Sequence, residues 1–128
     1  MSGKNVSRGL IALLLVVLVS SFAAEAPLVK FSPVGTWEYS VPGLQPGYEK
    51  GSMVIAEDGK DYKVTMVLNE YYKTEAEKVV YKKKTISFTI WVETEEILVS
   101  GSFDRDEFKG SLRYFEGDFS ITAKRTAK

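Results

Sequence analysis

The sequence predicts an all-β domain, an eight-stranded antiparallel up-and-down barrel preceded by a signal peptide. Two observations lead to this fold class. From residue 34 onward apolar and polar residues alternate with period two, and turn-forming residues recur at intervals of roughly 8–12 residues, as in sandwiches and barrels. Short connections permit only antiparallel neighbours, so the strands should form a meander, and closing the meander removes its exposed edges.

Alternation and turn residues define the first four strands. The first places Trp37 and Tyr39 on one face and ends at the Pro- and Gly-rich segment 42–47. The second ends in a hairpin turn, where Gly59 supplies a positive φ. The third alternates Tyr, Val, Met and Leu with mostly polar residues. The fourth emerges from segment 70–78, whose helix-like composition is too short to form a helix and runs into β-branched valines.

Four further strands complete the pattern. A tight turn at Lys83 leads to the fifth, which keeps Ile, Phe and Val on one face. The sixth and seventh carry Gly101 and Gly110 on their apolar faces, where glycine relieves crowding or leaves space in a barrel wall. The acidic turn 104–107 between them lacks the spacing of a calcium loop and is interpreted as a solvated hairpin. The eighth follows a turn at Gly117. The predicted strands cover residues 34–41, 51–57, 62–68, 75–82, 85–93, 96–103, 108–114 and 119–125.

The N-terminal residues have the pattern of a secretory signal peptide. Lys4 and Arg8 precede the apolar run 10–19, small residues follow, and cleavage is expected after Ala23. The run is shorter than the roughly 20 residues that span a bilayer, which favours a cleaved leader over a membrane anchor and leaves no membrane span after cleavage. The protein is therefore expected to be exported, to a periplasm or to the medium. The predicted organisation is 1–23 signal peptide, 24–33 linker and 34–126 barrel.

Composition excludes several function classes. The sequence contains no cysteine and no histidine, which removes disulfides, Ser–His and Cys–His nucleophilic systems, and zinc sites built on thiolates or imidazoles. Basic and acidic residues balance at 17 each, and losing the leader makes the chain slightly acidic. Nucleic acids and anionic membranes need a basic face, so neither is expected as a partner. We expect no catalytic residues, no metal and no cofactor.

The residues Gly35, Thr36 and Trp37 on the first strand and Arg125 on the last resemble the lipocalin and fatty-acid-binding superfamily, the calycins. In that group Gly-x-Trp opens the first strand and an arginine from the last strand packs across the tryptophan. The match covers residues 34–126 and is closest to small lipocalin-like domains of secreted bacterial proteins. It implies that Gly35, Trp37 and Arg125 close one barrel end, with a guanidinium–indole contact of about 0.5–2 kcal/mol.

An eight-stranded barrel has an interior that is either filled by its own side chains or holds one small ligand. Both alternatives are compatible with the sequence. If a ligand is held, the expected lining consists of inward-facing apolar and tyrosine side chains. These are Tyr39, Met53, Val64, Met66, Phe88, Ile90, Phe103, Leu112 and Tyr114.

Two functions follow from these observations. The leading one is a non-catalytic exported barrel that binds a small apolar or amphipathic molecule in its interior. The alternative is an accessory or inhibitory module that binds another exported protein through its loops and outer wall. That alternative rests on Trp91, predicted to face outward, on Tyr71 and Tyr72 in a predicted loop, and on the loop 42–47.

Overall fold

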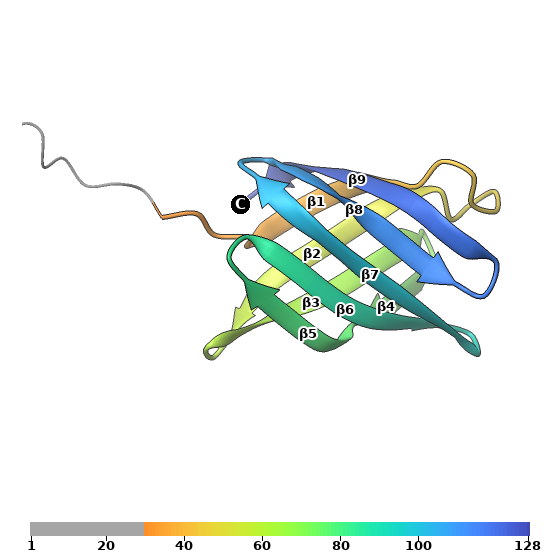
Figure 1. The fold of residues 1–128 in the computed structure, drawn as a ribbon, viewed down its shortest axis with the longest axis horizontal. Helices are drawn as coiled ribbons and strands as arrows, with labels where there is room; N and C mark the ends of the chain where they lie inside the picture. The colour runs from red at the N-terminus through yellow and green to blue at the C-terminus, as the bar shows by residue number, and fades with distance from the viewer. Residues whose placement is uncertain (1–29) are drawn as a thin grey trace, which may run out of the picture. The chain divides into compact units, whose positions relative to one another are not determined.

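The computed structural model describes residues 30–128, and every regular element among them is a β-strand (Figure 1). The predicted signal peptide and most of the predicted linker lie outside the described residues. The described chain contains no helix that could cross a membrane. The strands are β1 (Gly35–Ser40), β2 (Lys50–Asp58), β3 (Asp61–Asn69), β4 (Tyr72–Glu75), β5 (Glu77–Lys82), β6 (Thr85–Val92), β7 (Glu95–Asp104), β8 (Glu107–Tyr114) and β9 (Gly117–Ala127).

The strands form one antiparallel sheet that curls into a nearly closed barrel. Their spatial order is β4-β3-β2-β1-β9-β8-β7-β6-β5. The first and last strands pair antiparallel, with Trp37 opposite Arg125, as expected for the meander, but β4 and β5 do not pair, so the predicted closure is incomplete. The sheet edges therefore lie in the middle of the sequence, at β4 and β5, rather than at the ends of the domain.

The strand count differs from the prediction, with nine strands in place of eight. The predicted fourth strand and the loop before it form two strands, one at each edge of the sheet. β4 pairs with β3, and β5 pairs with β6. Ala76 lies between them and donates its backbone N–H to the carbonyl of Val64 at 2.8 Å. The segment 72–82 thus passes from one sheet edge to the other and bridges the opening.

Side chains connect the two sheet edges where the backbone ladder is interrupted. The Tyr72 hydroxyl donates to the carbonyl of Trp91 at 3.4 Å and accepts the backbone N–H of Glu93 at 3.2 Å. The indole Nε1 of Trp91 donates to the Glu77 carboxylate at 3.3 Å. We call this junction between β4–β5 and β6 the seam. The two bonds of the Tyr72 hydroxyl join the two sheet edges, the Trp91 bond lies between the paired strands β5 and β6, and all three are long and exposed.

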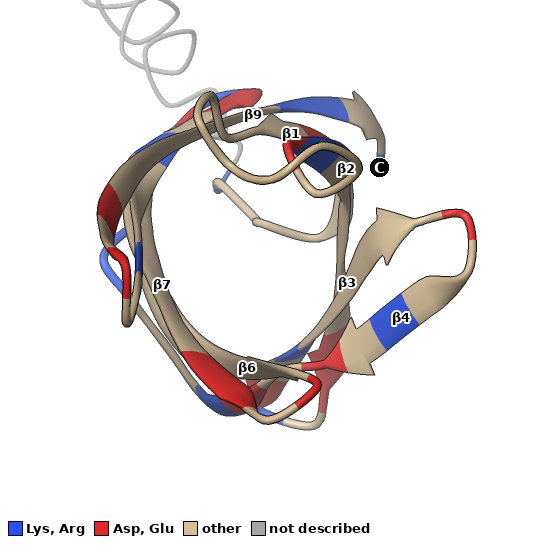
Figure 2. Cartoon of the chain, turned by 90° about the vertical axis from the view of Figure 1, so that its right-hand side faces the viewer, with Lys and Arg blue, Asp and Glu red and all other residues tan. Residues whose placement is uncertain are grey.

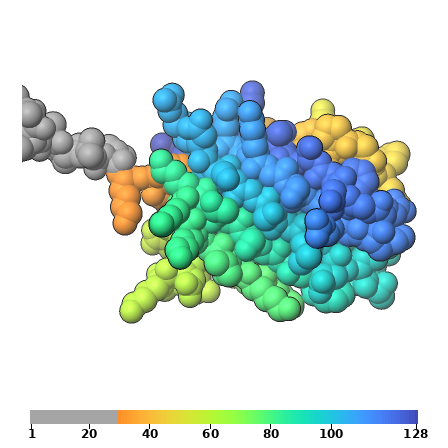
Figure 3. All heavy atoms as spheres, viewed as in Figure 1, coloured from red at the N-terminus to blue at the C-terminus, as the bar shows by residue number. Residues whose placement is uncertain are grey.

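The core follows the predicted alternation. Of the side chains expected to line the interior, Tyr114 is half-buried rather than buried, and the other eight are buried. β4 and β5 contribute no fully buried residue, so the seam is also the least buried part of the wall. In the space-filling view, side chains of β5 to β9 cover one face of the barrel (Figure 3). The buried core consists of Trp37, Tyr39, Val41, Met53, Ile55, Val64, Met66, Leu68, Ile86, Phe88, Ile90, Val99, Phe103, Phe108, Leu112, Ile121 and Ala123.

One barrel end is closed by Arg125 and aromatic rings. The Arg125 guanidinium lies over Trp37, 4.8 Å from the ring centroid, and its side chain is only 6% exposed. It donates to the carbonyl of Ser32 at 2.6 Å and to the Asp106 carboxylate at 2.8 Å. Phe103 packs beneath, with its ring centroid 4.9 Å from that of Trp37. We call this the closed end.

Gly35 allows the last strand to approach the first at the closed end. Its φ is +142°, and a Cβ there would collide with the carbonyl oxygen of Ala127 and come within 2.9 Å of the Arg125 side chain. The glycine of Gly-x-Trp is therefore required by both conformation and space.

Gly101 and Gly110 lie opposite each other on β7 and β8. A Cβ on Gly101 would come within 2.5 Å of the Phe108 ring and of the Lys109 carbonyl oxygen. The paired glycines accommodate that ring and the close backbones, and they leave no space in the wall.

Candidate functional site

A cavity of about 160 Å³ opens at the barrel end opposite Arg125. Figure 2 looks onto this end, which we call the mouth. The cavity is mainly apolar inside and has polar residues at its rim. Its lining consists of Tyr39, Leu44, Gln45, Tyr48, Met66, Leu68, Ile90, Val92, Glu93, Glu95, Ile97, Leu112 and Tyr114.

Strand ends and one loop position this lining. β1, β3, β6, β7 and β8 each direct their mouth-side inward residues into it, and the loop 41–49 contributes three more. The loop is held at both ends: Val41, which is fully buried, donates its N–H to the carbonyl of Glu49 at 2.7 Å. Inside the loop, Tyr48 donates its N–H to the carbonyl of Gln45 at 3.0 Å. The Pro- and Gly-rich segment therefore forms a defined part of the mouth.

The structure divides the predicted ligand lining into two groups. Tyr39, Met66, Ile90, Leu112 and Tyr114 line the cavity. The other four predicted residues do not line the cavity. They pack in the core, because aromatic rings fill the closed end of the barrel. These four are Met53, Val64, Phe88 and Phe103. The interior is thus filled at the closed end and hollow at the mouth.

Several lining residues were not predicted from the sequence. Leu68, Val92, Glu95 and Ile97 lie where the inward alternation of β3, β6 and β7 continues to the strand ends. The predicted alternation already places Leu68, Val92 and Ile97 on the apolar faces of their strands, and extending it by one position beyond the predicted start of the β7 strand reaches Glu95. Leu44, Gln45 and Tyr48 come from an irregular loop, where no periodicity indicates which side chains turn inward.

Tyr39 carries an unpaired hydroxyl in this cavity. The residue is 4% exposed, and its hydroxyl is the only buried side-chain polar atom among the described residues that has no hydrogen-bond partner. Burial raises the pKa of Tyr39 to about 12, so the phenol is neutral near pH 7. Leaving such a group unpaired costs about 1–3 kcal/mol. A polar atom of a guest molecule would remove that cost.

Gly51 makes room for the Tyr39 phenol. The two residues are paired across β1 and β2, and a Cβ at position 51 would come within 2.7 Å of the Tyr39 hydroxyl. The glycine therefore sets the position of this buried, unpaired hydroxyl.

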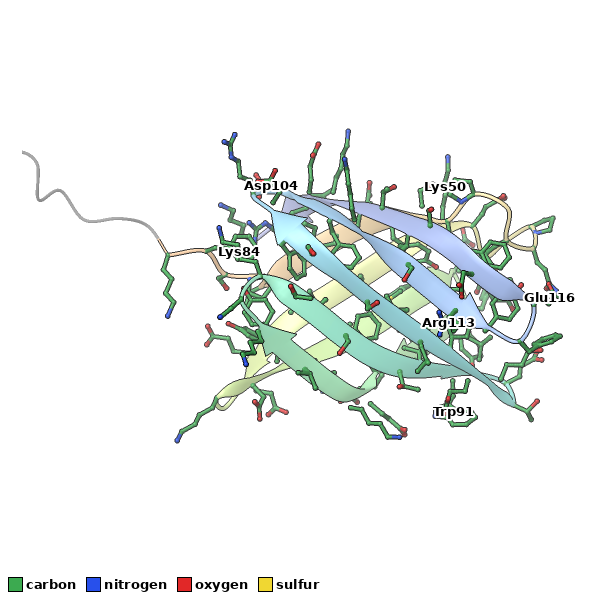
Figure 4. All side chains as sticks on the ribbon, in the orientation of Figure 1. Lys50, Lys84, Trp91, Asp104, Arg113 and Glu116 are labelled. Atoms are coloured by element: carbon green, nitrogen blue, oxygen red, sulfur yellow. The ribbon has the colours of Figure 1, made fainter. Side chains whose placement is uncertain are left out.

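The rim of the cavity is acidic. Glu93 and Glu95 belong to the lining, and none of the described lining residues is Lys or Arg. The Tyr114 hydroxyl donates to the Glu116 carboxylate at 2.9 Å. Burial first, then Glu116 and Glu95, raise the pKa of Tyr114. Glu116 and Trp91 lie at the mouth, whereas Lys84 and Asp104 lie toward the closed end (Figure 4).

Acidic groups elsewhere do not assemble into a metal site within residues 30–128. In the turn 104–107, Asp106 accepts a hydrogen bond from Arg125 and is part of the closed end. The hairpin interpretation of that turn agrees with its position between β7 and β8.

Three large aromatic side chains are exposed near the mouth. Tyr71 is 93% exposed, Phe115 is 74% exposed and Trp91 is 41% exposed. The outward orientation predicted for Trp91 is confirmed. Tyr72, predicted to share a loop with Tyr71, instead begins β4 and forms part of the seam.

Fold and cavity together define a class, a nearly closed antiparallel meander barrel with a small pocket at one end. No protein-family profile matches the chain, and no curated protein sequence matches it. Among solved structures it is similar to the wild-type fluorescent protein UnaG, with 11% sequence identity, a TM-score of 0.49, and coverage of 73% of this chain and 97% of that one. A point mutant of UnaG matches with the same identity and TM-score, covering 75% of this chain and 97% of the other.

Proposed function

We propose that this protein is a non-catalytic β-barrel that binds one small apolar or amphipathic ligand in the mouth cavity. The observation that carries the proposal is the apolar cavity of about 160 Å³ with the unpaired Tyr39 hydroxyl in its lining. An apolar cavity of about 150 Å³ is large enough to hold benzene. The bound ligand, or the part of it that enters the barrel, is therefore about the size of one aromatic ring.

The closed end supports a relationship to the calycins. Arg125 covers Trp37 at 4.8 Å, Gly35 permits the close approach of β9, and the first and last strands pair. These are the features that the resemblance in sequence implies. The relationship favours binding in the interior over chemistry on a substrate, since the barrel offers no nucleophile–base pair among the described cavity residues.

We also infer that the protein is exported through its N-terminal leader and acts in a periplasm or outside the cell. The basic start, the apolar run and the small residues before Ala24 support this inference. The intact mass of the protein purified from its own host tests it. A chain beginning at Ala24 supports export, whereas a chain that retains residues 1–23 in the soluble cell fraction contradicts it.

Native mass spectrometry of the same preparation tests ligand binding. We expect a mass excess that disappears on denaturation. Val92→Trp should abolish the excess, because Val92 lines the cavity and an indole there would fill much of it. Val80→Trp is the matched control, since Val80 is 59% exposed. A clean apo mass together with no binding of ring-sized probes such as benzyl alcohol would contradict the proposal.

The exposed aromatics Tyr71, Trp91 and Phe115 favour a second candidate, a module that binds an exported protein through the rim and outer wall. Partner binding of that kind should be lost in a Tyr71→Ser/Phe115→Ser variant and retained in Val92→Trp. If a small ligand binds in the interior, its binding should be lost in Val92→Trp and retained in Tyr71→Ser/Phe115→Ser. The two variants therefore separate the two functions.

A further inference from the structure

We propose that the ligand of the mouth cavity is an organic cation, a small apolar body that carries an ammonium group. This inference rests on the proposed function, because it names the chemical class held by the same cavity. It follows from three features of the mouth: the charge of the rim, the acceptors and aromatic faces in the lining, and the distribution of charge along the barrel.

Carboxylates surround the mouth without basic counterparts in its connections. The connections at this end are residues 41–49, 70–71, 93–94 and 115–116, and each holds one glutamate and no Lys or Arg (Figure 2). Glu93 also lines the cavity itself. A rim of one charge sign raises the local concentration of ligands of the opposite sign and repels ligands of the same sign.

Glu95 brings one carboxylate to the entrance of the apolar interior. It occupies the inward-facing alternation of β7, two residues before Ile97, and both line the cavity. On the neighbouring strand, the Tyr114 hydroxyl donates to Glu116. An ammonium group at the entrance would therefore lie near carboxylate acceptors while the apolar part of the ligand contacts the barrel interior.

The neutral groups of the lining suit the same ligand class. The Tyr39 hydroxyl is unpaired and its residue is 4% exposed, and its oxygen can accept an N–H donor. Tyr48 and Tyr114 add aromatic rings to the lining, and aromatic faces attract cations. A carboxylate ligand would meet Glu93 and Glu95 with no Lys or Arg among the described lining residues to offset them.

The connections at the closed end are mostly basic, while the adjoining strand ends carry Asp58, Asp61, Asp104 and Glu107. The connections there, residues 59–60, 83–84 and 105–106, contain four basic residues and one acidic residue. The acid is Asp106, which already pairs with Arg125. The connections that hold a glutamate and no Lys or Arg are therefore those at the end that carries the cavity, with Lys50 following one of them on β2, and a chain of near-zero formal charge still presents glutamates at this entrance.

Three probes with the same ring and different charge test the proposal: benzylamine, benzyl alcohol and benzoate. They are titrated into the protein expressed from the full-length chain, and binding is followed by NMR chemical shifts, which suit dissociation constants on the order of millimolar. At low salt we expect benzylamine to bind at least about fivefold more tightly than benzyl alcohol, and benzoate to bind more weakly than either. High salt should reduce the difference, because the rim carboxylates are exposed.

Charge-neutralising variants assign the preference to the rim. Glu93→Gln/Glu95→Gln should bring the affinity for benzylamine within about twofold of the affinity for benzyl alcohol, because the charge at the entrance is removed. Glu57→Gln/Asp58→Asn makes the same change in charge at the exposed last residues of β2, at the closed end, and should keep the preference. All four positions are exposed, so both variants should fold.

The outcomes separate this inference from the function on which it rests. Equal or tighter binding of benzyl alcohol or benzoate by the unmodified protein overturns the cation preference and leaves interior binding standing. A preference that survives Glu93→Gln/Glu95→Gln likewise overturns the role of the rim. Failure of all three probes to bind overturns the proposed function, and this inference with it.

Discussion

Arg125 combines three kinds of contact that another side chain cannot reproduce together. Its guanidinium covers Trp37, donates to the carbonyls of Ser32 and Val34 at 2.6 and 3.1 Å, and pairs with Asp106 at 2.8 Å. A planar guanidinium with five N–H donors can make these contacts together. The ammonium of a lysine is a point charge and cannot both cover the ring and reach all of these acceptors. The sequence predicted the stacking through the Gly-x-Trp resemblance. The backbone carbonyls lie in an irregular segment and could not be inferred from periodicity.

Replacing Arg125 should therefore destabilise the closed end. For Arg125→Met we expect a loss of about 2–4 kcal/mol in the free energy of unfolding, because buried carbonyls lose their donors and the Trp37 ring loses its cover. Urea unfolding followed by Trp fluorescence measures it. Lys124→Met, at the exposed neighbouring position on β9, is the control. Equal losses in the two variants would show that the guanidinium contacts are unimportant.

Tyr39 gives a pH dependence whose sign is fixed by its burial. Its pKa is about 12 in the folded chain and about 10 in an unfolded chain. Between those values the unfolded state releases the phenolic proton first, so the folded state binds more protons and stability falls as pH rises. The loss attributable to Tyr39 is about 1.4 kcal/mol by pH 11.

Tyr39→Phe removes this contribution and serves as the comparison. The difference in unfolding free energy between the unmodified protein and the variant, measured by urea unfolding from about pH 8 to about pH 11, should shift in favour of the variant as pH rises. Subtraction cancels the titration of the other tyrosines. A difference that does not change with pH would mean that the Tyr39 hydroxyl is solvated in the folded chain.

At the scale of elements, the missed strand β4 shows what alternation can and cannot reveal. The strands with a clear apolar face were predicted within a few residues of their ends. β4 carries the residues Tyr-Lys-Thr-Glu and has no fully buried position, so no period-two apolar signal marks it. It is a strand because β3 offers it unpaired backbone groups, which is a tertiary cause. The same reason explains why a single predicted strand is divided between two sheet edges.

The seam depends on side chains, so a single hydroxyl should matter there. Tyr72→Phe removes the hydrogen bonds to Trp91 and Glu93. We expect a small loss of about 0.5–1 kcal/mol in the free energy of unfolding, since the contacts are long and exposed. The variant should have a larger effect on local opening. Tyr72→Phe should accelerate amide exchange in β4 and β5 more than in β2 or β8.

Tyr71→Phe is the matched control for the seam, because Tyr71 is 93% exposed and its backbone N–H, not its hydroxyl, makes the bond to Asn69. Its exchange rates should equal those of the unmodified chain. Unchanged exchange in Tyr72→Phe would mean that the strand pairs β3–β4 and β5–β6 hold the edges together without the phenol.

At the scale of the whole molecule, the barrel has a filled half and a hollow half. The sequence left both states of the interior open, because alternation identifies which residues point inward but not whether their volumes fill the space. The outcome depends on where the large rings lie. Trp37 and Phe108 pack on Phe103 at the closed end, with ring centroids about 5 Å from that of Phe103, while aliphatic side chains, three tyrosines and one loop leave a cavity at the mouth.

This asymmetry predicts how a ligand should change the dynamics of the barrel. The closed half is held by buried aromatic contacts, so its amides should exchange through global unfolding, whereas the mouth half should also exchange through local opening at the seam. A ligand at about 100 times its dissociation constant adds about 2.7 kcal/mol to any opening that releases it. Adding benzylamine should therefore slow exchange at mouth-side amides that open locally, such as those of Leu68 and Ile90, by up to about 100-fold.

The closed-end amides should slow to the same degree only if they exchange through unfolding that also releases the ligand. Slowing confined to the closed end would contradict a ligand at the mouth. In Val92→Trp, neither half should respond, because the indole occupies the space that the ring of the ligand would take.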